Sequence, residues 1–365
     1  MSTTVITNTT TTTENPVFGH SSFDEHEQVV FCQDKDTGLK AIIGVHNTVL
    51  GPALGGTRMY AYQNESQALN DVLRLSRGMT YKAAITNLNL GGGKAVIIGN
   101  PKQLKTPDLM RRFGRFVHSL SGTYYTAEDV GMETEDMDTI REVTPFVTGI
   151  SKNRGGAGNP SPVTAYGVYM GMKAAAKYTY GSDRLTGKKI LVEGVGHVGE
   201  ELVRLLSEED ANVYISDINT DKLLEVQEKY QAIIVDNTQI YMQDMDIYAP
   251  CALGATLNDQ SIPQLKASIV AGAANNQLAD ENLHGKMLQQ RGIVYAPDFL
   301  INAGGIINVN AEIAGYGEEE ITQRTENIYH TTLDILQKAA SDRTTTLTAA
   351  MAIAKERIIR RKMMN

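Results

Sequence analysis

The feature that most constrains the fold of this chain is a glycine-rich turn, Gly194-Val-Gly-His-Val-Gly199. A predicted short strand with an apolar, β-branched centre (188–193) precedes the turn, and a predicted helix (200–208) follows it. The first glycine allows a tight turn, the second lets a pyrophosphate approach the backbone, and the third lets strand and helix pack closely. Such a turn between a strand and a helix is typical of a dinucleotide-binding unit. The candidate contacts are Gly194, Val195, Gly196, His197, Val198 and Gly199.

Strand and helix patterns alternate beyond this turn. We expect strands at 212–216 and 232–235 with a helix at 221–229 between them, and further strands at 246–249, 268–271 and 293–296. Alternation of this kind predicts a parallel, doubly wound sheet of the Rossmann type.

Asp217, at the end of the 212–216 strand, favours NAD over NADP. An acid roughly 20 residues beyond the glycines accepts hydrogen bonds from the ribose hydroxyls and repels a 2′-phosphate. The next residues, 218–220, include no Arg or Lys that could bind that phosphate. The alternative, an empty turn with Asp217 as a helix cap, becomes less favoured once the strand and helix context is considered.

The N-terminal half has a different pattern. Residues 29–49 predict a hairpin, 65–80 a helix capped by Asn64 and followed directly by Lys82, and 104–120 and 134–142 two more helices. The Gly- and Pro-rich stretch 151–162 is unsuited to a helix or central strand, and a helix at 164–178 follows it.

We therefore expect an α/β protein of two domains, because 365 residues exceed what one core usually supports. A Thr-rich disordered tail (1–15) would precede a substrate-binding and oligomerisation domain (16–149) and a Rossmann-type NAD-binding domain (150–341). The final helix, within 342–365, would pack back on the first domain. The active site would lie in the cleft between the domains.

Composition narrows the classes of function. A net charge of −8 argues against nucleic-acid binding, and no apolar run is long enough for a membrane span. The two cysteines, Cys32 and Cys251, cannot form a disulfide framework or a zinc site, so we expect no metal. The N-terminal residues resemble no targeting signal, which favours a cytoplasmic location.

Two lysines bracket an apolar, glycine-rich stretch: Lys82 and Lys94, the latter directly after Gly91-Gly-Gly93. A single such lysine is usually a solvated charge. Lys82 is a like charge that would lower the pKa of Lys94 and let it act as a base, and Asp129 is a carboxylate that could relay a proton. The alternative for Asp129 is a helix cap.

Several segments resemble the glutamate/leucine/phenylalanine/valine dehydrogenase family, most closely its leucine branch. They run in order with matching gaps from about residue 29 to the C-terminus, and they are 51–59, 77–98, 126–131, 158–168, 249–254, 271–277 and 302–308. The resemblance implies oxidative deamination of L-leucine and related branched-chain amino acids to 2-oxo acids with NAD. It also implies a homo-oligomer built through the first domain.

The resemblance implies a role for each matching residue. Lys82 would bind the substrate carboxylate, Lys94 would be the general acid/base, and Asp129 would assist proton transfer, with the glycines beside Lys94 letting their backbone approach the substrate. The remaining implied contacts are Gly55 and Asn276 for the substrate, Leu54, Ala127, Ile306 and Val309 for its side chain, and Thr164, Ala252 and Asn275 for the cofactor.

The implied side-chain pocket is aliphatic or small, which disfavours glutamate. Ile306 replaces the valine expected from the family and narrows this pocket, so the ranking of leucine and valine stays open. Two alternatives remain. One is phenylalanine dehydrogenase, for which Ala127 and Ile306 leave less room. The other is an inactive NAD-binding regulatory protein, which would be expected to have lost one of Lys82, Lys94 or Asp129.

Overall fold

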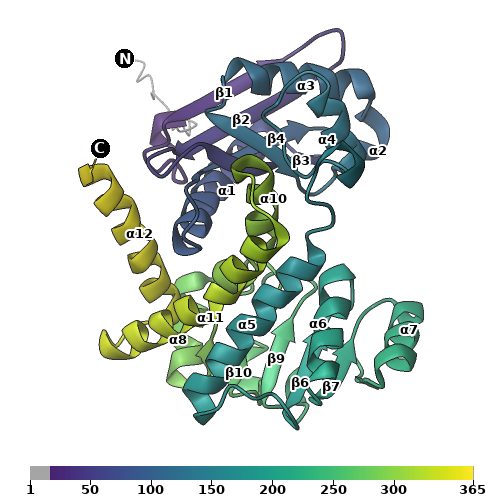
Figure 1. The fold of residues 1–365 in the computed structure, drawn as a ribbon, viewed down its shortest axis with the longest axis vertical. Coiled ribbons are helices and arrows are strands. Elements are labelled where there is room, and N and C mark those ends of the chain that lie inside the picture. Colours follow the sequence, from purple (N-terminus) through teal and green to yellow (C-terminus); the bar gives the residue numbers. More distant parts are fainter. Residues whose placement is uncertain (1–16, 365) are drawn as a thin grey trace, which may run out of the picture.

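The computed structural model describes residues 17–364 as a two-domain α/β protein (Figure 1). Each domain is built around its own sheet, and the sheets have five and six strands. The Thr-rich tail, for which disorder was predicted, lies outside the described residues.

The sheet of the first domain is mixed. Its order is β1-β2-β4-β3-β5, with β1 antiparallel to β2, β2 antiparallel to β4, and β3 parallel to both β4 and β5. The predicted hairpin is β1 and β2. The elements are η1 (Val17–Gly19), β1 (Gln28–Gln33), β2 (Lys40–Asn47), β3 (Ala53–Tyr60), α1 (Glu65–Ile85), β4 (Gly91–Ile98), α2 (Pro101–Leu104), α3 (Pro107–Ser119), β5 (Tyr124–Glu128) and α4 (Thr134–Arg141).

Helix α1 begins as predicted and ends later. The Asn64 side chain caps it by accepting a hydrogen bond from the Gln67 N–H. The helix runs on through buried Tyr81, Ala83 and Ala84 to Ile85, so Lys82 lies in its last turn and does not follow it. The apolar residues beyond position 80 continue the buried face, and packing on that face keeps them helical.

The triple glycine forms the first three residues of strand β4. A Cβ on Gly92 would meet the Thr80 backbone nitrogen at 2.1 Å, and one on Gly93 would meet the Tyr124 ring at 2.6 Å. The glycines therefore let α1 and β5 pack directly against β4. This close packing replaces our explanation that they bring backbone close to the substrate.

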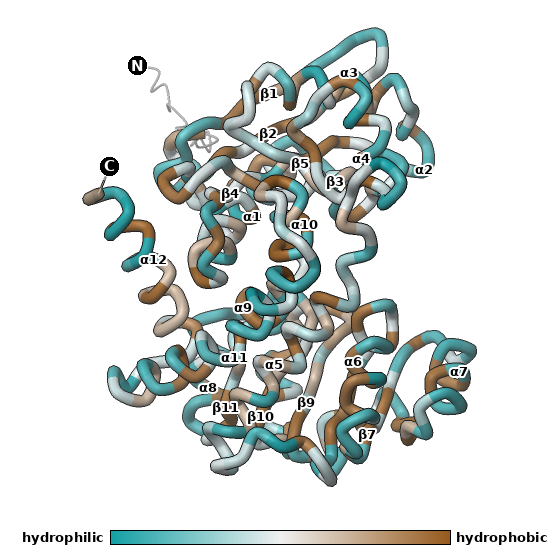
Figure 2. The backbone as a smooth tube through the Cα atoms, viewed as in Figure 1, coloured by the Kyte–Doolittle hydropathy of each residue, from teal (hydrophilic) through white to brown (hydrophobic). Residues whose placement is uncertain are grey.

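The second sheet is wholly parallel and doubly wound, as predicted. Its order is β11-β10-β9-β6-β7-β8. Strands β7 and β8 therefore follow on one side of β6, and β9 to β11 are added on its other side. Its strands are β6 (Lys189–Glu193), β7 (Asn212–Ser216), β8 (Ile233–Ile234), β9 (Ile247–Pro250), β10 (Ile269–Val270) and β11 (Val294–Tyr295). Hydrophobic colours follow these strands and hydrophilic ones the outer turns (Figure 2). Ligands bind such sheets at the carboxyl ends of the strands where the order reverses, here between β6 and β9.

Helices surround the second sheet and reach toward the first. They are η2 (Lys152–Arg154), α5 (Ser161–Tyr180), α6 (His197–Glu208), α7 (Thr220–Tyr230), η3 (Ile240–Met242), η4 (Ile262–Gln264), α8 (Glu281–Gln290), α9 (Asp298–Ile301), α10 (Gly304–Ala314), α11 (Glu318–Ser341) and α12 (Thr346–Met364). No helix among residues 17–364 is long and apolar enough to cross a membrane.

Helices α10 and α12 form hydrogen bonds with residues between 83 and 157. Glu312 of α10 accepts hydrogen bonds from the backbone N–H groups of Gly149 and Ala157, at 3.1 and 2.8 Å. Arg357 of α12 donates to the carbonyl oxygens of Ala83 and Leu88 at the end of α1, at 3.2 and 2.8 Å. These hydrogen bonds stabilise the arrangement of the two domains at two places, one beside the linker and one at the end of α1.

Candidate active site

Lys94 and Asp129 face each other across the first sheet. Lys94 lies in β4 with only 5% of its side chain exposed, and its Nζ donates a hydrogen bond to Oδ2 of Asp129, which directly follows β5. Burial is the largest influence on Lys94 and lowers its pKa, and the positive charge of Arg58 lowers it further, while Asp129 opposes both. The sequence predicted a lowered pKa for Lys94 from the charge of Lys82. In the structure, burial is the main cause.

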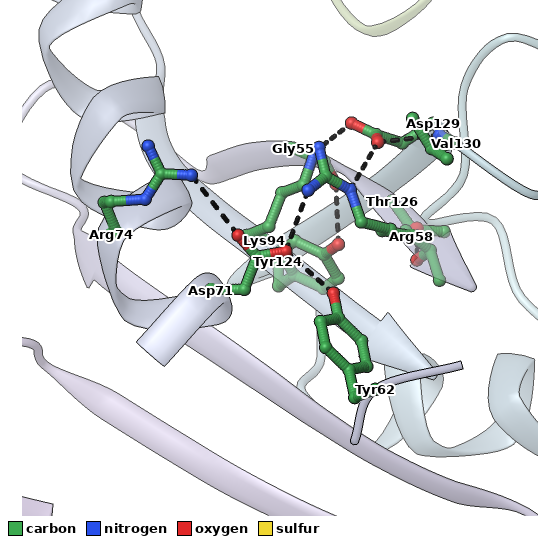
Figure 3. A network of polar contacts seen from close by, with 11 residues as sticks. Gly55, Arg58, Tyr62, Asp71, Arg74, Lys94, Tyr124, Thr126, Asp129 and Val130 are labelled. Carbon is green, nitrogen blue, oxygen red and sulfur yellow. Dashed lines mark hydrogen bonds and ion pairs between the residues drawn. The ribbon is translucent and has the colours of Figure 1, made fainter. Parts of the chain in front are cut away.

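Asp129 is held in its ionised form. Burial alone would raise its pKa, but Lys94 and Arg58 outweigh burial and lower the pKa to about 2. Its Oδ1 accepts hydrogen bonds from Arg58 Nε at 3.2 Å and from the Val130 N–H at 2.7 Å (Figure 3). The pair is therefore an anchored carboxylate beside a lysine that loses its proton more easily than usual, which is an arrangement suited to general acid/base chemistry.

Lys82 approaches the second domain. Its Nζ donates to Oδ1 of Asn302 at 2.7 Å, and the Asn302 amide donates in turn to Oδ1 of Asn275 at 2.8 Å. Burial lowers the pKa of Lys82 to about 8, against the opposing charge of Asp298. An ammonium in such a position can bind a carboxylate.

One cavity of about 560 Å³ brings most of the predicted substrate residues together. Both lysines and Asp129 line it. So do His197 from the glycine-rich turn and the predicted contacts Leu54, Gly55, Ala127, Ile306 and Val309. Leu54 and Ala127 come from strands β3 and β5, and Ile306 and Val309 from α10, so the cavity lies between the two domains.

The glycine-rich turn fits a dinucleotide. Gly194 has φ +95°, and a Cβ on Gly199 would meet the Gly194 oxygen at 1.9 Å, so both positions require glycine for the turn and for close packing. A Cβ on Gly196 would meet no atom of residues 17–364 within 4 Å, which leaves an open cradle above the turn. Gly196 is also the N-cap of α6 and offers no capping side chain, so the first N–H groups of that helix are available to a phosphate.

Asp217 lies where the prediction placed it, at the end of β7. Its Oδ2 accepts a hydrogen bond from the Val195 N–H at 2.8 Å, and its Oδ1 accepts one from the Asn219 N–H at 2.9 Å. The carboxylate thus holds the turn in shape and stays partly exposed beside it. Ala252 adjoins the turn as well, because a Cβ on Gly194 would meet the Ala252 Cβ at 2.7 Å.

Three predicted contacts lie at the edge of the cavity or apart from it. Thr164, in the first turn of α5, donates to the Pro160 oxygen at 2.9 Å and adjoins Gly305, which lines the cavity. Asn275 is reached through Asn302. Asn275 and Asn276 both line a different cavity, of about 310 Å³, beside α1 and α8.

Sequence reasoning missed Arg58, Asp71 and Asn302 as neighbours of the site. Arg58 and Asn302 fall within the segments 51–59 and 302–308 that carried the family resemblance, but no role was assigned to either. Their contacts join β3 to α1 and α1 to the second domain, and no spacing along the chain reveals such pairings.

Comparison with known proteins agrees with this geometry. Residues 26–145 match the Glu/Leu/Phe/Val dehydrogenase dimerisation domain, and residues 217–365 match the Glutamate/Leucine/Phenylalanine/Valine dehydrogenase domain. The chain belongs to the Glu/Leu/Phe/Val dehydrogenase family. It is therefore an amino-acid dehydrogenase, an oxidoreductase that acts on a CH–NH2 group with NAD as its cofactor.

Relatives within this dehydrogenase family differ in substrate. The chain is 55% identical to leucine dehydrogenase of Bacillus subtilis (strain 168), over 92% of each chain. It is 44% identical to phenylalanine dehydrogenase of Caldalkalibacillus thermarum (strain TA2.A1), over 93% of each. The crystal structure of L-tryptophan dehydrogenase from Nostoc punctiforme superposes with a TM-score of 0.83 at 49% identity, covering 93% of this chain and 97% of that one.

Proposed function

We propose that this dehydrogenase deaminates L-leucine and related branched-chain amino acids to 2-oxo acids, ammonia and NADH, reversibly. The observation that carries the proposal is the single cavity in which two lysines and Asp129 lie with the aliphatic side chains of Leu54, Ile306 and Val309. Its other charged lining residue is Glu128. The acid Glu128 would repel a γ-carboxylate, which disfavours glutamate as the substrate.

In this proposal each group has one task. Lys82 binds the substrate α-carboxylate and fixes Cα, and its contact with Asn302 is exchanged for that ion pair. NAD, held by the glycine-rich turn and Asp217, would supply the hydride acceptor for the hydrogen on Cα. Lys94, in its neutral form, then takes a proton from the water that attacks the resulting imine, and Asp129 stabilises the lysine cation so formed. The lysine cation then returns the proton to the amino nitrogen, the Cα–N bond breaks to release ammonia, and the hydroxyl group loses its proton as the 2-oxo acid forms.

We propose the same roles for the cofactor contacts as the sequence implied. The turn Gly194–Gly199 and the N-terminus of α6 would hold the pyrophosphate, Asp217 the ribose, and Thr164, Ala252 and Asn275 the nicotinamide end. Asn276, which lines another cavity, would contact the substrate only after a movement of its loop.

The division of the chain is also a proposal. We place the boundary between residues 149 and 150, with 16–149 binding substrate and forming the homo-oligomer and 150–341 binding NAD. The contacts of Arg357 with the end of α1 support assigning the C-terminal helix to the first domain. The mass of the purified protein in solution tests the oligomer, and a monomer would contradict it.

A panel of amino acids with NAD and NADP, read by the absorbance of the reduced cofactor, tests the substrate. We expect the highest kcat/KM with leucine and NAD, valine and isoleucine within about 10- to 200-fold because one methylene is worth ~1–3 kcal/mol, and no activity with glutamate. A higher kcat/KM with phenylalanine or tryptophan would overturn the proposal.

Lys94→Ala tests the mechanism. We expect turnover to be abolished while NADH still binds, because Lys94 is remote in sequence from the glycine-rich turn and belongs to the other domain. Lys40→Ala is the matched control, since Lys40 lies in the same sheet with 56% of its side chain exposed and should retain full activity. Deamination retained by Lys94→Ala would refute its role as the base.

A further inference from the structure

A charged network adjoins the Lys94 and Asp129 pair (Figure 3). Its members Arg58, Tyr62 and Asp71 are not among the residues that line the substrate cavity. Arg58 joins two carboxylates: its Nε donates to Asp129 Oδ1 at 3.2 Å and its NH1 donates to Asp71 Oδ2 at 2.8 Å. Tyr62 donates its hydroxyl to the same Asp71 oxygen at 2.7 Å. Arg74 reaches the other Asp71 oxygen at 3.4 Å.

The sheet register places Arg58 on the same face as Lys94. Arg58 pairs with Val96 on the neighbouring strand, and Val96 is two residues from Lys94, so the two side chains point the same way. Asp71 comes from α1, which packs on that face. The guanidinium is therefore fixed from both sides, with a quarter of its side chain exposed.

Arg58 also separates two cavities. Lys94 and Asp129 line the substrate cavity, whereas Arg58, Tyr62 and Asp71 line a second, open cavity of about 610 Å³. A guanidinium does not give up its proton in proteins, so the network cannot carry protons from one cavity to the other. Its influence on the site must be electrostatic and geometric.

We propose that Arg58, held by Asp71, is a positioning residue that fixes the Asp129 carboxylate toward Lys94 and, as a nearby positive charge, favours loss of the proton from Lys94. The inference deepens the proposed function and rests on Lys94 acting as the base. Without Arg58, Asp129 Oδ1 would keep only the Val130 N–H as an anchor. The carboxylate could then turn away from Lys94, and the lysine would keep its proton to higher pH.

The charges that face Lys94 come from three elements. Asp129 follows β5, Arg58 lies in β3, and Asp71 and Lys82 lie in α1. Asp129 and Asp71 raise the pKa of Lys94 and Arg58 lowers it, in addition to the larger lowering by burial. Lys82 and Lys94 are like charges, and each therefore favours the neutral form of the other. Removing Arg58 and removing Asp71 should consequently have opposite effects.

The test is the pH profile of kcat for deamination by the full-length enzyme with saturating NAD. In the wild type, activity should rise with pH as Lys94 loses its proton. In Arg58→Gln the pKa of Lys94 rises, so the midpoint of that rise should move to higher pH. Below the midpoint, each unit of this movement lowers kcat about tenfold, because the rate follows the neutral fraction of the lysine.

Matched variants separate charge from structure. Asp71→Asn removes a negative charge, so its midpoint should move to lower pH, while kcat on the plateau falls because Arg58 loses its support. Arg58→Lys keeps the charge but cannot contact both carboxylates, so its midpoint should stay near that of the wild type while kcat falls. Arg74→Gln is the control, because Arg74 contacts Asp71 but not Asp129 and should leave the profile unchanged.

A lower kcat at every pH with unmoved midpoints in Arg58→Gln and Asp71→Asn would overturn the inference, because it would leave Arg58 only a structural role. Movement of both midpoints in the same direction would overturn it as well. Should Arg58→Gln fail to fold, Arg58→Lys still decides, because a wild-type kcat in this variant, which cannot contact both carboxylates, would overturn the positioning role. Turnover by Lys94→Ala would instead refute the proposed function, and that result is independent of any Arg58 variant.

Discussion

At the scale of single residues, the chemistry depends on lysines removed from water. Lys94 has an aspartate as its partner, whereas Lys82 donates to a neutral amide, that of Asn302. A carboxylate can therefore approach Lys82 without displacing another anion. This difference suits Lys82 to binding and Lys94 to proton transfer.

We predict that Lys82→Met raises KM for leucine about 10- to 100-fold, because hydrogen bonds to a charged group are worth ~1.5–3 kcal/mol. The Kd for NADH should not change, since Lys82 lies in α1 of the first domain. Steady-state kinetics and fluorescence titration with NADH measure the two quantities. An unchanged KM would mean that another group binds the substrate carboxylate.

The sequence predicted the residues that carry chemistry better than those that support them. Lys82, Lys94 and Asp129 could be singled out because charged residues beside glycine-rich, apolar stretches are unusual. Arg58 and Asp71 have no such unusual sequence context and read as common surface charges. Only the pairing of β3 with β4 and the packing of α1 show that both lie near Lys94.

At the scale of elements, periodicity predicted the six strands of the second sheet, but it gave no comparable signal for β3, β4 and β5. The second set of strands alternates with helices, which gives a periodic signal. Strands β3 and β4 instead contain Gly55, Gly56 and the triple glycine, which usually indicate turns. A Cβ on Gly55 would meet the Gly93 oxygen at 1.7 Å, so close backbone packing overrides local preference.

The glycine-rich turn offers a prediction about one element. Gly196→Val should weaken NADH binding at least about tenfold, because its side chain would fill the open cradle that lies over the N-terminus of α6. The Tm should change little, since the added atoms meet no neighbour in residues 17–364 within contact distance of the Cβ. Isothermal titration and thermal unfolding of the purified protein provide both measurements.

Gly194→Ala is the contrasting variant. Its φ of +95° and the approach of Ala252 to 2.7 Å make any side chain unfavourable, so this change should lower Tm as well as affinity. Equal affinities for NADH in Gly196→Val and the wild type would place the pyrophosphate elsewhere.

At the scale of the whole molecule, the last helix stabilises the first domain from a distance in sequence. Arg357 donates to three backbone carbonyls near the end of α1, those of Ala83, Ala84 and Leu88. A cation at the carboxyl end of a helix also interacts favourably with the helix dipole. Helix α1 carries Lys82 only one residue before these carbonyls.

We predict that Arg357→Met destabilises the protein by about 1.5–3 kcal/mol and lowers Tm, because three carbonyl groups lose a charged donor. Arg360→Met is the control, since the Arg360 side chain is 71% exposed and pairs with Glu356 one turn earlier, and we expect it to change stability by about 0.5 kcal/mol at most. Denaturant unfolding of both variants measures the difference, and equal midpoints would show that the Arg357 contacts add nothing to stability.

Because both domains line the substrate cavity, selectivity for the substrate side chain should depend on how the domains move relative to each other. Leu54 and Ala127 belong to one domain and Ile306 and Val309 to the other, so the room offered to a side chain depends on how closely the domains approach. A bulky amino acid would hold the two domains apart, so that a nicotinamide bound to the second domain would lie too far from the substrate Cα. A small amino acid would let the domains approach each other, but its side chain would make few contacts with the cavity and bind weakly. An unsuitable substrate should thus be rejected through slow turnover as well as weak binding. A substitution on the side of the cavity formed by one domain alone should therefore change kcat and KM together.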